Sequence, residues 1–596
     1  MPTYKAPLRE FKFLFRNVLN IDRYANLPGF ADAPMDLVEQ VLEEGAKFCE
    51  NVLQPLNAVG DHEGCTRHAD GSVTTPTGFK DAYKLLVEGG WPALGSDRSY
   101  GGQGLPHVVS LAWNEMVSSA NMAFGMYPGL SHGAYEAIHH HGSDELKQTY
   151  LPKLVTGEWT GTMNLTEPHC GTDLGLLRTK AVPQADATFR ITGQKIFISA
   201  GEHDLAPNII HLVLARIEGA PGGVKGISLF IVPKFIVDAN GEPGPRNGVV
   251  CGKIEEKMGI HGNATCVLNY DDAVGYLVGQ ENKGLNAMFT MMNVARLGVG
   301  MQGLAQSEAA YQNGVAYAKD RLQGRSLTGA KNADGPADPI IVHPDVRRML
   351  MDARAFNEGA RAFTFWTALY GDLLTYSPDE KVREKAGDYM ALMTPVLKGY
   401  LTDKGYANAT NCQQIFGGHG YIEEWGMSQF VRDARIAQIY EGANGIQALD
   451  LVGRKLAANG GRAVFTFFNE IDAFIGENAD DPQMKVYLDG LTTAKAQLQE
   501  GTMWLMQNGM SNFDNAGAAS HDYLHLFGIT ALAYMWALMA KASLEAKKAN
   551  GADPFYDTKI VTGRHFVERM LPDAAAHLAK LKSGSDTLMA LSADAF

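Results

Sequence analysis

Residues 189–200 read FRITGQKIFISA, and this run, with three others of the same kind, decides the fold. The others are NIIHLVLARI (208–217), GISLFIVPKF (226–235) and TCVLNY (265–270). Each is short, rich in β-branched or aromatic residues, and separated from the next by Gly or Pro, which is typical of strands joined by turns. We therefore predict a β-rich region of roughly 120 residues, an ordinary size for a domain.

The sequence on both sides of this region has a helical period. MDLVEQVLEEGAKFCENVLQPL (35–56) and GFKDAYKLLVEGGW (78–91) carry apolar residues at helical spacing. The same period returns near residue 281 and continues to the end, with turn-like breaks at 327–339 and 457–461. Because helices and strands are segregated along the chain, we predict an α+β fold and not an alternating, doubly wound one.

Composition and charge exclude some classes of function. The 596-residue chain has a formal net charge of −14, and nucleic-acid binding needs basic surface to neutralise phosphates. The six cysteines are scattered without a CxxC pair, which predicts a reducing compartment and no disulfide framework. The N-terminus lacks the apolar core of a secretory signal. We expect a cytoplasmic protein, with the mitochondrial matrix as the less favoured alternative.

One apolar stretch approaches the length of a membrane span. YLHLFGITALAYMWALMA (523–540) is near the minimum of about 17 residues for a spanning helix. It contains His525, Gly528 and Thr530, with two tyrosines and a tryptophan. We interpret it as a buried helix of a bundle, and membrane contact is the disfavoured alternative.

Two motifs have ordinary structural explanations. Residues 298–303 (GVGMQG) match GxGxxG, but the sequence on both sides is helical, whereas a dinucleotide site needs a preceding strand. Close helix packing explains these glycines better. His139, His140 and His141 are consecutive, so their side chains diverge by about 100° on a helix and do not suit a single metal ion. We expect a solvated helix end there and predict no metal site.

Two polar segments carry more chemical content. NLTEPHCGTD (164–173) offers hydroxyls and backbone N–H groups to a polar ligand, although an ordinary polar loop is an equal interpretation. In RDARIAQIYEGANGIQ (432–447), Glu441 follows an apolar run and precedes Gly442, where we expect a helix or strand to end. A partly desolvated glutamate suits base chemistry. From the residues alone, a capping or salt-bridged glutamate remains the favoured interpretation.

Seven segments, in order, resemble the signatures of the acyl-CoA dehydrogenase family over residues 45–456. They are YGGQGL (100–105), GSDELKQTYLPKLVTGE (142–158), NLTEPHCGTD (164–173), KIFISAG (195–201), EKMGIHGNAT (256–265), QIFGGHGY (414–421) and RDARIAQIYEG (432–442). The length and the extra C-terminal helices resemble the large bacterial members, including the methylmercaptopropionyl-CoA type, and more loosely the very-long-chain enzymes.

The resemblance implies a domain order and a cofactor. It implies an N-terminal helical domain with a leading extension (1–160), a middle β-barrel or sandwich (161–280), a C-terminal four-helix bundle (281–456) and an additional helical domain (457–596). FAD would lie between the middle domain and the bundle, and a second subunit would complete its adenosine site. The resemblance therefore implies at least a homodimer.

The resemblance also assigns roles to individual residues. Glu441 would be the catalytic base. Cofactor contacts are implied for Leu165, Thr166, Thr172, Phe197, Ser199, Arg321, Gln323, Gln414, Gly417, Gly418, Ala443 and Gly445. Substrate contacts are implied for Thr172, Asn293, Arg296, Tyr440 and Gly442. The chain departs from the family pattern at Gly324 (often Phe), Ala443 (usually Thr), Asn293 (Asp in some relatives) and Phe197 (Trp).

The implied reaction is α,β-dehydrogenation of an acyl-CoA to a trans-2-enoyl-CoA, in fatty-acid β-oxidation or related catabolism. Electrons would pass to an electron-transferring flavoprotein. Three alternatives stay open: an acyl-CoA oxidase that uses oxygen, a 3-methylmercaptopropionyl-CoA dehydrogenase, and a non-catalytic CoA-binding relative.

Overall fold

The computed structural model describes residues 2–509 and 511–596. Contacts divide the chain into two compact units. The helical unit comprises Met1–Ala46, Pro106–Glu115 and Val299–Phe596, and the β-unit comprises Lys47–Leu105 and Met116–Gly298. This division does not test the four domains predicted from the sequence, which stay a prediction.

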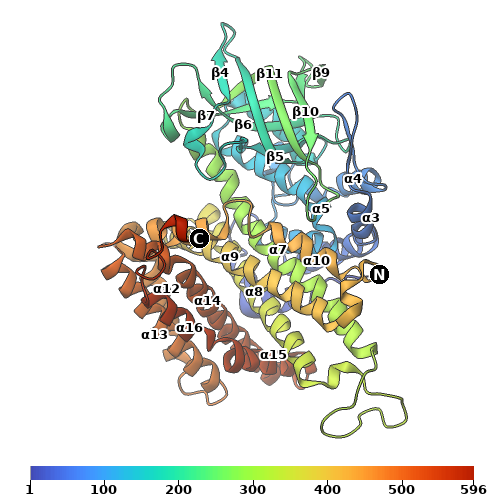
Figure 1. The fold of residues 1–596 in the computed structure, drawn as a ribbon, viewed down its shortest axis with the longest axis vertical. Coiled ribbons are helices and arrows are strands. Elements are labelled where there is room, and N and C mark those ends of the chain that lie inside the picture. Colours follow the sequence, from blue (N-terminus) through green and yellow to red (C-terminus); the bar gives the residue numbers. More distant parts are fainter. Residues whose placement is uncertain (1, 510) are drawn as a thin grey trace. The chain divides into compact units, whose positions relative to one another are not determined.

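The β-unit is built on a small closed barrel (Figure 1). β11 pairs with β5, β5 with β4, β4 with β6, β6 with β7, and β7 again with β11, so the hydrogen-bonded path returns to its start. β3 and β10 extend the sheet from β6 and β11. The strands are β3 Thr160–Asn164, β4 Lys180–Pro183, β5 Phe189–Ser199, β6 Ile209–Ile217, β7 Ile227–Pro233, β10 Val249–Ile254 and β11 Thr265–Val278.

Strand β6 is buried on both faces, because alternate side chains of a strand point to opposite sides. Val213 and Ala215 meet side chains from the other barrel strands. Leu212 and Leu214 pack in a second core with side chains of the helices α5 (His107–His141) and α6 (Asp144–Thr156). This double burial explains why β6 reads as a nearly continuous apolar run.

The β-unit also contains smaller elements. Two hairpins, β1–β2 and β8–β9, were not predicted, because strands this short leave little periodicity to detect. The predicted strand at 265–270 is the first part of the longer β11. Apart from short 3-10 helices, the other elements are η3 Cys49–Leu53, α3 Pro55–Glu63, β1 Thr66–Arg67, β2 Val73–Thr74, α4 Phe79–Glu88, β8 Phe235–Val237 and β9 Pro243–Arg246.

The three consecutive histidines end α5, as predicted. Their rings diverge to separate partners: His139 to Asp97, His140 to Glu136 and His141 to Thr290. All six cysteines are free thiols.

The helical unit centres on long helices that pack closely at glycines. A Cβ on Gly303 would lie 2.6 Å from the backbone oxygen of Leu401, and one on Gly405 would lie 2.2 Å from the backbone oxygen of Gly303. This confirms that the GxGxxG match lies within α7 and serves helix packing. The elements are α1 Leu8–Phe13, α2 Met35–Phe48, α7 Gly284–Asp320, whose first residues belong to the β-unit, α8 Pro344–Tyr376, α9 Glu380–Ile415, α10 Met427–Ile436 and α11 Asn444–Asp450.

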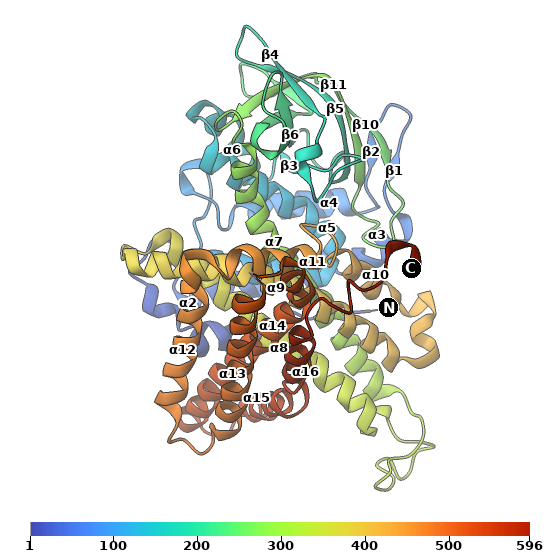
Figure 2. The ribbon, with the colours of Figure 1, turned by 60° about the vertical axis from the view of Figure 1, so that its left-hand side comes forward.

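The C-terminal helices surround α14 (Figure 2). Trp536 of α14 donates its ring N–H to the backbone oxygen of Ala355 on α8 at 3.0 Å, and Gly528 lets α14 approach Tyr400 of α9. One helix among the described residues, Phe513–Ala549, is long and apolar enough to cross a membrane, but 94% of its apolar window is buried inside the protein. These helices are α12 Arg462–Asn478, α13 Lys485–Asn508, α14 Phe513–Asn550, α15 Pro554–His565 and α16 Asp573–Lys582.

Candidate active site

Glu441 lies in a tight turn between α10 and α11. The sequence placed it at the end of a helix or strand; α10 in fact ends at Ile436, and Glu441 occupies the turn itself. Its φ is 60°, a region that non-glycine residues rarely adopt. Such a conformation costs about 1–3 kcal/mol and persists only where the surroundings fix it. The side chain is half-buried, and its Oε2 atom is shielded from solvent.

A buried ammonium group holds this turn. Lys398 of α9 is fully buried, and its Nζ donates to the backbone oxygen of Gly442 and to Oδ1 of Asn444, both at 2.8 Å. Gln447 donates to the backbone oxygen of Glu441 at 3.1 Å. Hydrogen bonds from a charged donor are the stronger kind, so they offset the strain of the turn.

Tyr440 links the turn to α7. Its hydroxyl donates to Oε1 of Gln302. Burial and the neighbouring Glu441 carboxylate raise the pKa of Tyr440, so the phenol stays protonated. A neutral tyrosine next to the carboxylate can therefore act as a fixed donor but adds no negative charge.

A second group of predicted residues follows the end of α9. Gln414 belongs to the last turn of this helix, and Gly417 and Gly418 come directly after it. All three are exposed, and a Cβ on either glycine would meet open space. Gly417 also has a φ of 57°. The bare backbone here can approach a ligand closely.

The end of α7 lies beside this second group. Tyr317 stacks on Phe416 with ring centroids 4.1 Å apart, and its hydroxyl donates to the backbone oxygen of Phe416 at 3.3 Å. Arg321 and Gln323, both exposed, follow immediately after α7. The structure therefore brings the predicted residues around 321 and 417 together.

The loop that carries Arg321 and Gln323 is organised by Asp338. Its carboxylate is buried and accepts backbone N–H groups from Ser326 at 2.8 Å and from Asn332 at 2.7 Å. These hydrogen bonds lower the pKa of Asp338 to about 2. The loop is thus built around an ionised carboxylate.

These residues and Glu441 belong to two separate parts of the helical unit. The Glu441 turn contacts α9 at Gly399, whose backbone oxygen accepts from Asn444. Gln414 lies four turns further along the same helix, which corresponds to roughly 20 Å at 1.5 Å per residue.

In the β-unit, the predicted segments 164–173 and 195–201 lie next to each other. The N–H of Ile196, beside Phe197, donates to the backbone oxygen of Thr166 at 2.9 Å. Phe197 has a φ of 59°, and 60% of its side chain is exposed. Leu165 is buried, and Thr166 is half-buried. An exposed aromatic ring beside a hydroxyl is a surface suited to a flat, polar-edged ligand.

A buried ion pair supports this surface. Lys195 of β5 donates to the backbone oxygen of Leu165 at 2.9 Å and to Oε1 of Glu167 at 2.8 Å. Glu167 also accepts the Thr179 N–H at 3.0 Å and the Thr179 hydroxyl. Burial raises the pKa of Glu167, but Lys195 and these hydrogen bonds outweigh it, and the pKa lies below its ordinary value.

The remaining predicted residues of the β-unit are less tightly grouped. Thr172 is exposed in the loop after β3, and Ser199 is half-buried at the end of β5. Asn293 and Arg296 are one turn apart on α7. Asn293 is exposed, whereas Arg296 is buried with its guanidinium 5.8 Å from the Phe289 ring centroid.

Four family models match nearly the whole chain. They are the acyl-CoA dehydrogenase N-terminal domain (37–158), middle domain (162–273) and C-terminal domain (282–456), and the acetyl-CoA dehydrogenase C-terminal-like model (467–592). The chain belongs to the acyl-CoA dehydrogenase family.

Relatives of this acyl-CoA dehydrogenase match it end to end. It is 42% identical to the 3-methylmercaptopropionyl-CoA dehydrogenase of Ruegeria pomeroyi, over 99% of this chain and 100% of that one. It is 34% identical to the broad-specificity linear acyl-CoA dehydrogenase FadE5 of Mycobacterium tuberculosis, over the full length of both. The Bacillus anthracis acyl-CoA dehydrogenase complexed with FAD shares the fold, with a TM-score of 0.75 and 22% identity over 92% of this chain and 88% of that one.

The predictions of fold, enzyme class and cofactor are therefore confirmed: the chain is an α+β oxidoreductase of a FAD-dependent family. The described residues also fit FAD. The exposed ring of Phe197 and the hydroxyls of Thr166 and Ser199 suit a flavin, and the open backbone at Gly417 and Gly418 lets another part of the cofactor approach closely.

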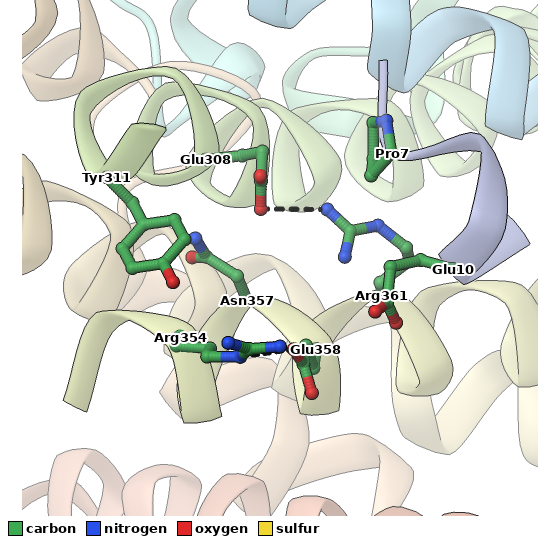
Figure 3. A pocket seen from close by; sticks show the side chains of 8 residues that line it. All are labelled: Pro7, Glu10, Glu308, Tyr311, Arg354, Asn357, Glu358 and Arg361. Carbon is green, nitrogen blue, oxygen red and sulfur yellow. Dashed lines mark hydrogen bonds and ion pairs between the residues drawn. The ribbon is translucent and has the colours of Figure 1, made fainter. Parts of the chain in front are cut away.

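A cavity of about 180 Å³ lies elsewhere in the helical unit (Figure 3). No predicted site residue lines it. Arg361 forms ion pairs with Glu115 at 2.7 Å and Glu308 at 3.0 Å, and Lys559 pairs with Glu358 at 2.9 Å and with Glu10 of α1. The ion pair of Lys559 with Glu10 binds α1 to α15, and the others join the neighbouring helices, so we assign the cavity a structural role.

The sequence did not reveal the residues that hold the site. Lys398 and Asn444 fix the Glu441 turn, and Lys195 and Glu167 fix the loop after β3. The signal that could have revealed them is the burial of two charged residues, Lys398 and Lys195. The burial of a single position cannot be predicted from the sequence alone.

Proposed function

We propose that Glu441 is the base that removes the α-proton of an acyl-CoA thioester. The observation that carries this proposal is the strained turn, which presents a half-buried carboxylate while the buried Lys398 fixes the backbone next to it. The α-hydrogen of a thioester is a weak acid, so its removal needs a poorly solvated carboxylate. Tyr440 and Gly442, on either side of Glu441, are proposed to line the thioester.

The cofactor complements this base. When bound, FAD supplies the acceptor for the hydride that leaves the β-carbon, so the product is a trans-2-enoyl-CoA. Within the chain, we propose that Phe197 and Thr166 meet the flavin and that Ala443 and Gly445 lie near it. Gly445 supports this role, since a Cβ there would meet open space.

We propose a homodimer in which each FAD is shared. The support is the distance of roughly 20 Å along α9 between the Glu441 turn and Gln414. Residues Arg321, Gln323, Gln414, Gly417 and Gly418 are exposed and would serve the cofactor of the partner subunit.

For the substrate, we propose a short acyl chain that carries a thioether, as in 3-methylmercaptopropionyl-CoA. The support is the identity of 42% to a dehydrogenase with that name, against 34% to the broad-specificity enzyme. Membership of the family supports an electron-transferring flavoprotein as the acceptor. The bacterial relatives support the bacterial cytoplasm as the proposed location.

The test is anaerobic reduction of the bound flavin, followed by its visible absorbance. Wild type, Glu441→Gln and the matched control Glu424→Gln, an exposed glutamate of the helical unit, are each mixed with 3-methylmercaptopropionyl-CoA. Loss of a general base slows a reaction by about 10²–10⁴-fold, so we expect this in Glu441→Gln alone. Equal bleaching by all three proteins would show that Glu441 is not the base.

The same preparation tests the other proposals. Pentanoyl-CoA has the same chain shape with CH₂ in place of sulfur, and faster reduction by it would contradict the thioether preference. Rapid reoxidation of the reduced flavin in air would identify an oxidase. A purified protein that neither carries nor binds FAD would support the non-catalytic alternative.

A further inference from the structure

The C-terminal helices contribute a buried histidine to the network behind Glu441. His525 of α14 is 6% exposed, and its Nε2 lies 2.9 Å from Oδ2 of Asp403 on α9. An ionised carboxylate only accepts hydrogen bonds, so Nε2 carries the hydrogen and donates it. The rings of His577 and Tyr400 lie 5.2 and 5.5 Å from that of His525 and fix its orientation.

The other oxygen of Asp403 holds both ends of the catalytic turn. Oδ1 accepts from Nε2 of Gln438 at 2.6 Å and from Nδ2 of Asn444 at 2.7 Å. These residues lie three positions before and three positions after Glu441. The N–H of Asn444 also donates to the backbone oxygen of Gln438 at 3.1 Å, which closes the turn. One carboxylate therefore connects His525 to both sides of Glu441.

This connection matters because the turn is strained. A φ of 60° at Glu441 is retained only if its neighbours prevent relaxation. Lys398 secures Gly442 and Asn444 from α9. The side chain of Gln438 has its anchor on Asp403, whereas Tyr440 has its own on Gln302, so the start of the turn at Gln438 depends on the orientation of this aspartate.

We propose that His525 is a positioning residue for dehydrogenation: by orienting Asp403, it fixes the turn from Gln438 to Asn444 and the direction of the Glu441 carboxylate. The proposal rests on the proposed role of Glu441 as the base. It assigns a function to the helices after residue 457, which complete the support of the catalytic turn from the side of α14.

The same side chains offer a second interpretation. Asp403, His521 and His525 have ligand atoms within 4.8 Å of one another, as a divalent cation would require. Both oxygens of Asp403 already accept hydrogen bonds from side-chain N–H groups. This favours the hydrogen-bond network, and metal analysis of the purified protein distinguishes the two.

The experiment compares three variants of the full chain. His525→Leu removes the donor to Asp403. His525→Gln keeps an N–H at a similar reach. His565→Leu is the matched control, because His565 of α15 is a similarly buried histidine that pairs with Asp352 at 2.8 Å, away from the Glu441 turn. The first readout is amide hydrogen exchange of peptides covering 436–447, which needs neither substrate nor flavin.

We expect exchange in 436–447 to rise about tenfold in His525→Leu, as for loss of a hydrogen bond to a charged group, and to stay near wild type in the other two variants. In the FAD-loaded protein, the rate of flavin reduction should fall about tenfold in His525→Leu, while the dissociation constant of the acyl-CoA changes less than twofold. His525→Gln should restore the rate.

Several results would overturn the proposal. These are unchanged exchange in His525→Leu, an equal rise in His565→Leu, or a stoichiometric metal ion whose removal reproduces the effect. If His525→Leu does not fold, Asp403→Asn must raise exchange in the same peptides, and its failure to do so counts against the proposal. If Glu441→Gln retains full activity, Glu441 is not the base, yet the exchange data still decide whether His525 holds the turn.

Discussion

Replacing Lys195 with Met tests whether a buried ion pair shapes the surface proposed to meet the flavin. The Lys195 side chain has no exposed surface, and its ammonium contacts the Leu165 backbone oxygen at 2.9 Å and the Glu167 carboxylate at 2.8 Å. Met has a similar length without the charge. The substitution leaves Glu167 with backbone and hydroxyl donors but removes its cation.

The expected loss follows from this geometry. Removing one partner of a buried pair costs about 3–5 kcal/mol. Because Glu167 keeps the N–H groups of Arg178 and Thr179 and the Thr179 hydroxyl, we expect the lower end, about 3 kcal/mol of unfolding free energy. The pKa of Glu167 lies below its ordinary value, so at neutral pH the carboxylate stays charged in the wild type.

The assay is urea denaturation together with FAD titration by flavin fluorescence. Lys253→Met is the matched control, because Lys253 of β10 pairs with Glu255 at 2.7 Å but is 64% exposed, and such surface pairs contribute about 0–1 kcal/mol. Lys195→Met should also weaken FAD binding, and adding Glu167→Gln should recover part of the stability. Equal destabilisation by the two lysine substitutions, or a double variant no more stable than Lys195→Met, would refute the reasoning.

Two further predictions concern protonation. Burial, assisted by Lys234, lowers the pKa of both His203 and His211 to about 3. The unfolded chain therefore binds protons first as pH falls below 6.5, and each histidine should cost about 2 kcal/mol of stability between pH 8 and pH 5. The measurement is the free energy of unfolding of wild type and of His203→Gln at pH 8 and at pH 5. If both proteins lose the same stability between the two pH values, the prediction for His203 is wrong. Asp338, with a pKa of about 2, stabilises its loop above pH 3.8 and loses this effect below it. Asp338→Asn at pH 7 should speed proteolysis within 321–339, and wild-type resistance would contradict this.

The sequence predicted the elements whose signal is local. The β-branched and aromatic residues of FRITGQKIFISA identified β5, and the helical sequence around residues 298–303 correctly excluded a dinucleotide site. The closure of the barrel could not be predicted from the sequence. This closure depends on β7 pairing with β11, and this pairing joins residues such as Ile231 and Tyr276 from strands that β8, β9 and β10 separate in sequence. The second half of β11 begins with two aspartates, which hide its strand character.

The candidate site shows the same limit. Glu441 and Phe197 stand in motifs, so a resemblance could point to them. The support of the Glu441 turn cannot be found this way, because Asp403 and His525 are 122 residues apart and neither belongs to a motif. Only the packing of α14 against α9 brings them into contact.

Two of the residues found through motifs, Phe197 and Glu441, also have a strained backbone. Asn and Asp adopt a positive φ readily, whereas Phe, Ile and Glu do not. Among the described residues, Phe197, Ile260 and Glu441 have positive φ values of 59°, 48° and 60°. Glycine at 197 or 441 would remove the strain, but it would also remove the ring or the carboxylate. At these two positions the strain accompanies a side chain with a proposed chemical role, and Lys398 and Gln447 surround Glu441 with hydrogen bonds that prevent relaxation.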